Sequence, residues 1–260
     1  MHRHLRAPLA AAILLTAGSA GAQTLIGLTA DNTLVRIDAA SRRAAAPVRV
    51  TGAEGRLIGI DIRPSNNLLY GVTDANQIVT IDPATGRATQ VSRLNMPFAD
   101  GGRAVVDFNP AADRLRLMGV SGVNFRINVD TGEVTRDGQL AYAQGTPQAG
   151  STPRIVAGAY TNSSGRPQAT ALYTIDTLLR SYNLQAPPND GVQQSRGMLP
   201  DLPAGVAFDI LADGDGGNAG WLLAGATLHR VDTATGAPTA VGAVTGLPAG
   251  AEVIDIAALR

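Results

Sequence analysis

The fold is decided by the stretch Leu69-Tyr-Gly-Val-Thr-Asp-Ala-Asn-Gln-Ile-Val-Thr-Ile-Asp82, which has a gapless copy 44 residues earlier. The copy is Leu25-Ile-Gly-Leu-Thr-Ala-Asp-Asn-Thr-Leu-Val-Arg-Ile-Asp38. Both stretches contain an apolar run with a glycine, a polar turn, an alternating run and a closing Asp. This pattern predicts a β-hairpin followed by a tight turn, in which the Asp side chain accepts hydrogen bonds from backbone N–H groups.

The hairpin pattern recurs three more times along the chain. The further copies close at Asp130, Gln185 and Asp232, so that Gln replaces the turn Asp in one of them. The five closing positions are therefore 38, 82, 130, 185 and 232, with spacings of 44, 48, 55 and 47 residues. Such a period is typical of repeat folds built from one four-stranded unit.

A short apolar run precedes each hairpin except the first, and the last such run, Val253-Ile-Asp-Ile256, has no hairpin after it. If this C-terminal strand completes the sheet begun by the N-terminal hairpin, the first hairpin gains its missing strand, the last strand gains its missing hairpin, and the chain contains five units. Ring closure of this kind is typical of a propeller, whereas an open solenoid requires capping ends. The sequence thus predicts an all-β fold, a five-bladed β-propeller of four-stranded antiparallel blades.

The N-terminus has the features of a secretory signal peptide. Two Arg residues precede an apolar run over 7–17, and a small-residue stretch then ends at Ala22. The run is too short for the roughly 20 residues that a membrane-spanning helix needs. We expect cleavage after Ala22, a single propeller domain over 23–260, and export to the periplasm or the extracellular space.

Composition excludes several classes of function. The chain has no Cys, which excludes thiol catalysis and thiolate metal sites. Its formal net charge is zero, unlike the basic footprint of a nucleic-acid-binding protein. Beyond residue 22 the single His is His229, so a His-rich metal site is excluded and a serine triad is poorly supported. We expect a monomer without a membrane span.

Several longer motifs resemble a known bacterial family. They include Val105–Leu117, Asn124–Gly132, Ala159–Asn162, Pro187–Gly191 and Gly205–Ile210. Together they resemble the Domain of Unknown Function family forty-three ninety-four over nearly the whole mature chain. The resemblance implies an exported, propeller-like bacterial protein, and it brings no established activity and no catalytic residues.

Four Asp residues are candidates for a metal site. Each lies in the first strand of its blade, which lines the central channel of a propeller: Asp61, Asp107, Asp209 and Asp255. Converging carboxylates could hold a hard cation such as Ca²⁺, which takes several oxygen ligands. In the alternative interpretation, each Asp accepts backbone hydrogen bonds from its own turn or from the next blade. Repetition across four blades favours this structural role.

The irregular part of the repeat is a second candidate region. The unit over 151–200 has Ala159 and Gln185 in place of the two repeated acids, and it contains the longest spacing. A polar and aromatic region beside regular blades is a reasonable place for a small-ligand site. The candidate ligand-binding residues are Asn124, Arg126, Asn128, Tyr160, Asn162, Asn189 and Asp190.

Three functions remain open from the sequence. The first is a non-catalytic exported propeller that binds a small molecule, glycan or protein at the channel mouth or the irregular blades. The second is a glycoside or lactone hydrolase that uses channel Asp residues with or without Ca²⁺. The third is a structural repeat of the envelope or matrix. A hydrolase requires at least two carboxylates that converge in an open cavity, with one pKa displaced.

Overall fold

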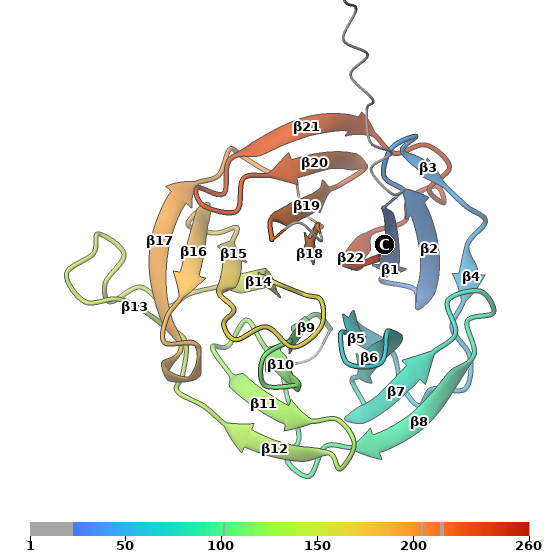
Figure 1. Cartoon of the computed structure of the whole chain (residues 1–260), viewed down its shortest axis with the longest axis horizontal. Coiled ribbons are helices and arrows are strands. Elements are labelled where there is room, and N and C mark those ends of the chain that lie inside the picture. Colours follow the sequence, from blue (N-terminus) through green and yellow to red (C-terminus); the bar gives the residue numbers. More distant parts are fainter. Residues whose placement is uncertain (1–22, 101, 204, 214–215, 260) are drawn as a thin grey trace, which may run out of the picture.

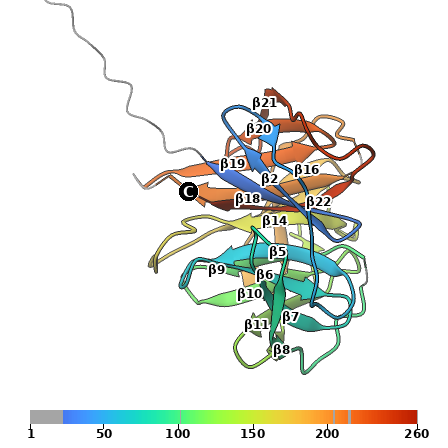
Figure 2. The same cartoon turned by 90° about the vertical axis from the view of Figure 1, so that its right-hand side faces the viewer.

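The chain forms a ring of five antiparallel β-sheets in the computed structural model, which describes residues 23–100, 102–203, 205–213 and 216–259 (Figure 1). The innermost strand of each sheet runs along the axis of the ring (Figure 2). This is the predicted five-bladed propeller. Within the described ranges no helix is long and apolar enough to cross a membrane. The predicted signal peptide, residues 1–22, lies outside the described residues.

Blades two, three and five have four strands each, ordered from the channel outward as they occur in the chain. Blade two consists of β5 (Leu57–Arg63), β6 (Leu68–Thr73), β7 (Gln77–Ile81) and β8 (Ala88–Arg93). Blade three consists of β9 (Val105–Asn109), β10 (Arg114–Met118), β11 (Asn124–Asn128) and β12 (Glu133–Arg136). Blade five consists of β18 (Val206–Ala212), β19 (Asn218–Ala224), β20 (Thr227–Val231) and β21 (Pro238–Ala243).

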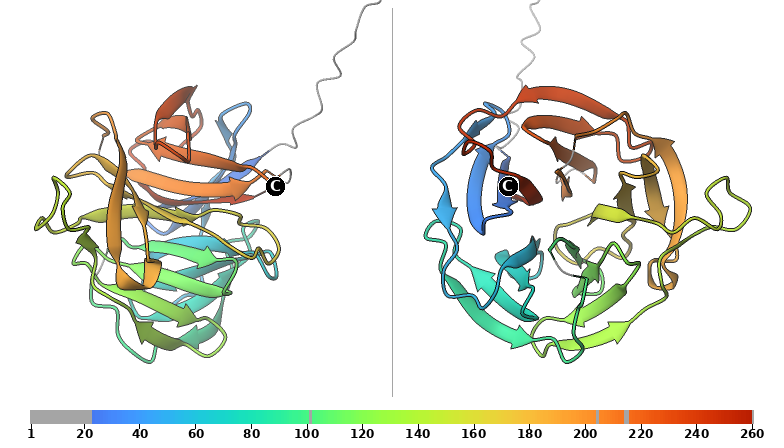
Figure 3. Two further views of the ribbon diagram at one scale, coloured as in Figure 1. Left: turned by 60° about the vertical axis from the view of Figure 1, so that its left-hand side comes forward. Right: turned by 180° about the vertical axis from the view of Figure 1, so that it is seen from behind.

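Blade four differs from these by an extra outer strand. Its strands in chain order are β13 (Ala141–Tyr142), β14 (Ile155–Tyr160), β15 (Leu172–Asp176), β16 (Ser181–Gln185) and β17 (Val192–Met198). The short 3₁₀ helix η1 (Pro188–Asp190) connects β16 to β17. Strand β13 pairs in parallel with β17, and the segment that follows it projects from the ring (Figures 1 and 3). The extra strand ties the end of blade three to the rim of blade four.

Blade one closes the ring by combining the two ends of the described chain. Its strands are β22 (Val253–Leu259), β1 (Thr24–Thr29), β2 (Thr33–Asp38), β3 (Arg43–Ala44) and β4 (Val48–Arg49). The C-terminal strand β22 is innermost and pairs antiparallel with β1, with Gly27 opposite Ile256. The predicted joining of the last strand to the first hairpin is confirmed.

Apolar side chains fill the spaces between neighbouring blades. Fifteen buried residues form the cluster between blades two and three, including an edge-to-face pair of Tyr70 and Phe108. The cluster between blades three and four contains six, among them Met118 and Tyr160. Since burial of apolar area is the main driving force for packing, this last interface depends more on polar contacts than the others do.

The turns after the second hairpin strands explain the repeated Asp. In blade two the Asp82 carboxylate accepts the backbone N–H of Ala84, and the backbone carbonyl of Asp82 accepts the N–H of Gly86. In blade three both acceptor roles fall to Asn128, whose carbonyl accepts the N–H of Gly132. The repeat alignment over Asp130 is therefore wrong by two residues, and Asn128 is the turn-capping residue of this blade.

Candidate functional site

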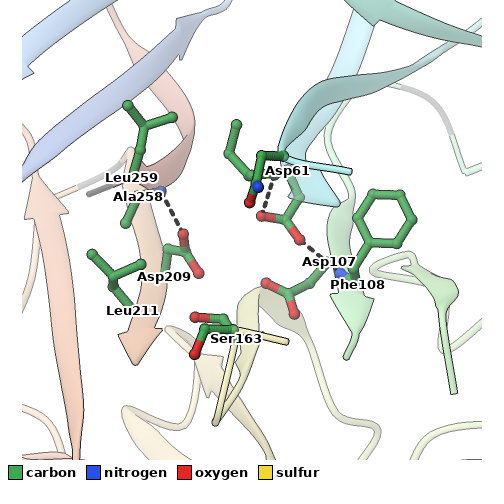
Figure 4. A pocket seen from close by; sticks show the side chains of 11 residues that line it. Asp61, Asp107, Phe108, Ser163, Asp209, Leu211, Ala258 and Leu259 are labelled. Carbon is green, nitrogen blue, oxygen red and sulfur yellow. Dashed lines mark hydrogen bonds between the residues drawn. The ribbon is translucent and has the colours of Figure 1, made fainter. Parts of the chain in front are cut away.

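A cavity of about 540 Å³ opens at the end of the channel where the inner strands finish (Figure 4). Three carboxylates meet in it, one each from β5, β9 and β18, and we name these residues, Asp61, Asp107 and Asp209, the carboxylate triad. One oxygen from each lies within 4.8 Å of one oxygen from each of the others. The cavity is also lined by Ile62, Asn67, Phe108, Ser163, Ser164, Leu211, Ala258 and Leu259.

Each triad carboxylate accepts a backbone N–H from an inner strand of the next blade. The three donor–acceptor distances are 2.7, 2.8 and 2.6 Å, for Asp61 with Phe108, Asp107 with Tyr160, and Asp209 with Ala258. These bonds tie adjacent blades together, as the structural interpretation of the repeated Asp predicts. The last pair joins blade five to blade one, because Asp209 lies on β18 and Ala258 lies on the closing strand β22.

The second carboxylate oxygens are not equivalent. In Asp61 and Asp209 the second oxygen accepts the N–H of the following residue, at 2.6 Å in both cases. Oδ2 of Asp107 accepts no hydrogen bond from any residue that the structure describes, although Asp107 is only 5% exposed. Asp107 thus presents a free acceptor to the cavity.

The fourth predicted metal ligand, Asp255, lies outside the triad. Strand register shows this. In blade two, Tyr70 lies opposite Asp61. In blade one, Ile26 is the residue equivalent to Tyr70, and it lies opposite Ala257. Ala257 therefore occupies the triad position of blade one, and Asp255 stands two residues earlier on β22. Its carboxylate accepts the N–H of Ile60 at 2.9 Å. The structure brings three of the four Asp residues together.

Burial raises the pKa of every triad carboxyl group. Burial is the largest cause for Asp61 and Asp107, whose pKa values rise well above the usual range, and nearby carboxylates raise both further. Burial also raises the pKa of Asp209, to about 6. A cation placed among the three would stabilise their ionised forms.

A loop from blade four completes the cavity wall. Ser163 and Ser164 lie in the segment between β14 and β15, and Ser163 Oγ accepts the N–H of Ala212 at 3.0 Å. The preceding residue, Asn162, exchanges hydrogen bonds with Asn218 in blade five. The predicted ligand residue Asn162 therefore anchors the loop that supplies the two serines.

Three other predicted ligand residues surround a buried arginine between blades three and four. The guanidinium of Arg116, a residue that is 1% exposed, donates to Tyr160 Oη, Asn124 Oδ1 and Asn189 Oδ1 at 3.1, 2.8 and 2.8 Å. It also forms an ion pair with Asp137 at 2.7 Å. The polar character that the sequence shows here serves blade-to-blade packing, and Asn124 additionally lines a hollow of about 120 Å³.

The remaining three predicted ligand residues do not converge. Arg126 pairs with Asp137 through two hydrogen bonds, at 2.7 and 3.0 Å. Asn128 caps its turn, and Asp190 is exposed on η1. None of the seven predicted residues lines the cavity above the triad.

The sequence patterns did not predict the two serines of the cavity wall or two buried arginines at blade interfaces. Ser163 and Ser164 belong to the insertion that gives the longest spacing, so that spacing was the available signal. Arg63, at the end of β5, is 7% exposed and pairs with Asp113 and Asp130 of blade three, each at 2.7 Å. No repeat pattern marks Arg63 or Arg116, because each is used at one blade interface only.

The triad could hold a metal ion with its three carboxylate oxygens. Calcium takes six to eight oxygen ligands, whereas magnesium keeps several waters. Beyond the triad, the lining offers oxygens from Asn67, Ser163 and Ser164, and the rest of the wall is mostly apolar. The arrangement suits a cation that needs few further oxygen ligands.

Comparison with known proteins places this architecture in a family. The profile of "Domain of unknown function (DUF4394)" matches residues 24–257, which is most of the chain. The chain belongs to this family. No curated protein matches the chain.

Three solved structures are similar to this chain at low sequence identity. A structural genomics protein of unknown function from Bacteroides thetaiotaomicron VPI-5482 is 17% identical, with a TM-score of 0.52 over 91% of this chain and 70% of that one. A protein of unknown function from Bacteroides caccae is 11% identical, with a TM-score of 0.45 over 87% and 74% of the two chains. A functionally unknown protein from Desulfotomaculum acetoxidans DSM 771 is 16% identical, with a TM-score of 0.46 over 90% and 70%.

Proposed function

We propose that this propeller is a binding protein that captures a small organic cation at the carboxylate triad of its channel mouth. The observation that supports this most is Oδ2 of Asp107, which accepts no hydrogen bond from the described residues, on a side chain that lines the cavity beside two further carboxylates (Figure 4). Because this oxygen is accessible from the cavity, an N–H donor on a ligand could form a charge-assisted hydrogen bond with it.

The triad has a spacing that suits a primary ammonium group. Such a group has three donors, and three acceptors at tetrahedral positions around a nitrogen about 2.8 Å away lie about 4.6 Å from one another. The triad oxygens lie within 4.8 Å of one another. The three oxygens are therefore close enough together for a single ammonium group to reach all three carboxylates.

The surroundings favour an organic cation over a bare metal ion. Ile62, Phe108, Leu211 and Leu259 line the cavity next to the triad, and these side chains provide no oxygen ligands. They provide instead the apolar contact that the carbon skeleton of an amine would use. The cavity volume of about 540 Å³ is in the range of small-molecule sites.

Thermal unfolding with n-butylamine tests the proposal. Because a ligand of the native state stabilises it by RT ln(1 + [L]/Kd), a tenfold excess over Kd raises the stability by about 1.4 kcal/mol and Tm by roughly 3–6 °C. The neutral control n-butanol, at equal concentration, should leave Tm unchanged. Equal shifts with both compounds, or none with either, would count against the triad as an ammonium site. A shift with millimolar CaCl₂ that a chelator reverses, in the absence of an amine effect, would assign the triad to a metal ion.

A second candidate is a glycoside hydrolase, which the raised pKa values favour. Asp107 combines burial, a raised pKa and an oxygen open to the cavity, as a general acid requires, and Asp209 lies beside it. Binding remains the first candidate because both oxygens of Asp61 and of Asp209 already accept backbone N–H groups. These bonds make both carboxylates weaker nucleophiles and bases, whereas each oxygen keeps a second lone pair that can accept an ammonium N–H. Release of nitrophenolate from 4-nitrophenyl glycosides, lost in Asp107→Asn, would establish hydrolysis instead.

A further inference from the structure

A second cavity of about 470 Å³ continues the triad cavity outward along blade two. The two cavities share Ile62, Asn67 and Leu259 in their walls. We name the second one the blade-two groove, and its remaining lining residues are Leu68, Leu69, Thr80, Ile81, Asp82, Pro83, Arg87 and Thr89. A molecule seated on the triad can therefore extend into this groove without leaving a lined surface.

The part of the groove nearest the triad is apolar. Its floor contains the buried side chains of Leu69 and Ile81, and Leu68 forms part of the lining while remaining 50% exposed. Among the described residues, Leu68 is one of three large apolar side chains with such exposure, beside Leu178 and Met198. Leu68 alone of these three lies in the groove. An apolar ligand segment would cover it.

Charge determines which end of a ligand faces the triad. The groove contains two charged side chains, Asp82 and Arg87. Asp82 is engaged by the N–H of Ala84 in its turn, and hydrogen bonds from this turn lower its pKa. Arg87 is exposed and would repel a second cation. At the outer end the negative charge of Asp82 and the positive charge of Arg87 oppose each other, whereas the inner end has three carboxyl groups. An ammonium group is therefore attracted more strongly to the triad end.

We propose that the ligand is an amphiphilic primary amine, whose ammonium group binds the carboxylate triad while an unbranched apolar chain of several carbons lies in the blade-two groove. This inference rests on the proposed function and deepens it by naming the ligand class. The chain would contact Ile62, Leu259 and Leu68 in turn and end near Thr80 and Thr89.

Calorimetric titration with propylamine, butylamine, hexylamine and octylamine tests the inference. Each methylene group buried in the groove should tighten binding by up to about fourfold, until the chain exceeds the groove and the affinity levels off. In Leu68→Ser the affinity for octylamine should fall roughly threefold to tenfold, while the affinity for propylamine stays within about twofold. The matched control is Leu178→Ser, another exposed leucine, which should change neither affinity.

The outcomes separate the two proposals. If propylamine binds and the longer amines bind no tighter, the groove inference is overturned and the triad proposal stands. An equal loss of octylamine affinity in both leucine variants would also overturn the groove. If no amine binds to a protein with unchanged circular dichroism, the ammonium site itself is refuted, and the groove inference with it.

Discussion

Asp107 at the channel mouth and Asp255 deeper in the channel make the same hydrogen bond in different surroundings. Both residues are buried, and each accepts one backbone N–H from a neighbouring inner strand, at 2.8 and 2.9 Å. Asp107 has two further carboxylates and a cavity beside it, whereas Asp255 has the positive charge of Arg103 in its vicinity. The hydrogen bond is thus an architectural feature of the propeller, and the accumulation of charge at a cavity is particular to the mouth.

The strongest difference between these two residues is expected in the affinity for butylamine. Asp107→Asn should weaken butylamine binding by a factor of about 100 or more, because a charge-assisted hydrogen bond and its ion-pair partner are lost together. The amide oxygen can still accept the N–H of Tyr160, so the fold should persist. Isothermal titration calorimetry measures the change.

Asp255→Asn is the matched control for this experiment. It also exchanges a buried carboxylate that accepts an N–H from the next inner strand for an isosteric amide, although Asp255 accepts a second N–H, from Ile256, at 3.0 Å. The affinity of this variant for butylamine should stay within about twofold of that of the unchanged protein. Similar losses in Asp107→Asn and Asp255→Asn would show that the effect comes from the channel charge as a whole and that the channel mouth has no particular role in binding.

The next largest effect is expected in the pH dependence of the unfolding free energy. A carboxyl group whose pKa is raised on folding stabilises the native state below its unfolded pKa, and this contribution disappears as the pH rises through the folded pKa. For Asp209 the pH window runs from 3.8 to about 6, and the unfolding free energy should fall by about 3 kcal/mol across it. Without ligand, the protein should therefore lose stability to urea between pH 4 and 7.

The Asp209→Asn variant sharpens this prediction. Because Asn does not titrate, the decline in unfolding free energy between pH 4 and 7 should be shallower in the variant than in the original chain. Saturating butylamine should flatten the decline in the original chain as well, since the bound ammonium favours the ionised triad. Parallel pH profiles for the two proteins would mean that Asp209 does not titrate in this range.

The smallest effect is expected at Arg103. Its Nε and Nη2 atoms are buried and have no hydrogen-bond partner among the described residues, and its charge lowers the pKa of Asp255. Arg103→Gln should raise that pKa further and reduce the stability at pH 8 relative to pH 5 by less than about 1 kcal/mol. Butylamine binding should be unaffected, which a titration at pH 7 checks. A marked loss of butylamine affinity in this variant would show that the charge near Asp255 influences binding at the channel mouth.

The fold could be predicted from the sequence because repetition compares the chain with itself. The orphan hairpin at residues 25–38 and the orphan strand at 253–256 together indicated closure of the ring. The triad was predicted in part, since Asp61, Asp107 and Asp209 were identified as channel residues. Asp255 was misaligned because the short strand around it contains apolar residues on both sides, so a shift of two positions leaves its pattern unchanged.

The role of the irregular blades could not be predicted from residue types alone. Asn124, Tyr160 and Asn189 suit a ligand site as well as they suit a buried network, and the decision depends on the position of Arg116. That side chain lies on a strand whose pattern resembles the other blades, and its four partners come from segments up to 73 residues away. Single-residue patterns contain no information on such contacts.

A crystal structure of the protein soaked in n-hexylamine would show whether an ammonium group binds the carboxylate triad. We expect electron density for the nitrogen about 2.8–3.0 Å from one oxygen each of Asp61, Asp107 and Asp209, with the carbon chain directed toward Leu68. Density for the amine elsewhere on the propeller, with the carboxylate triad contacting only water, would contradict it.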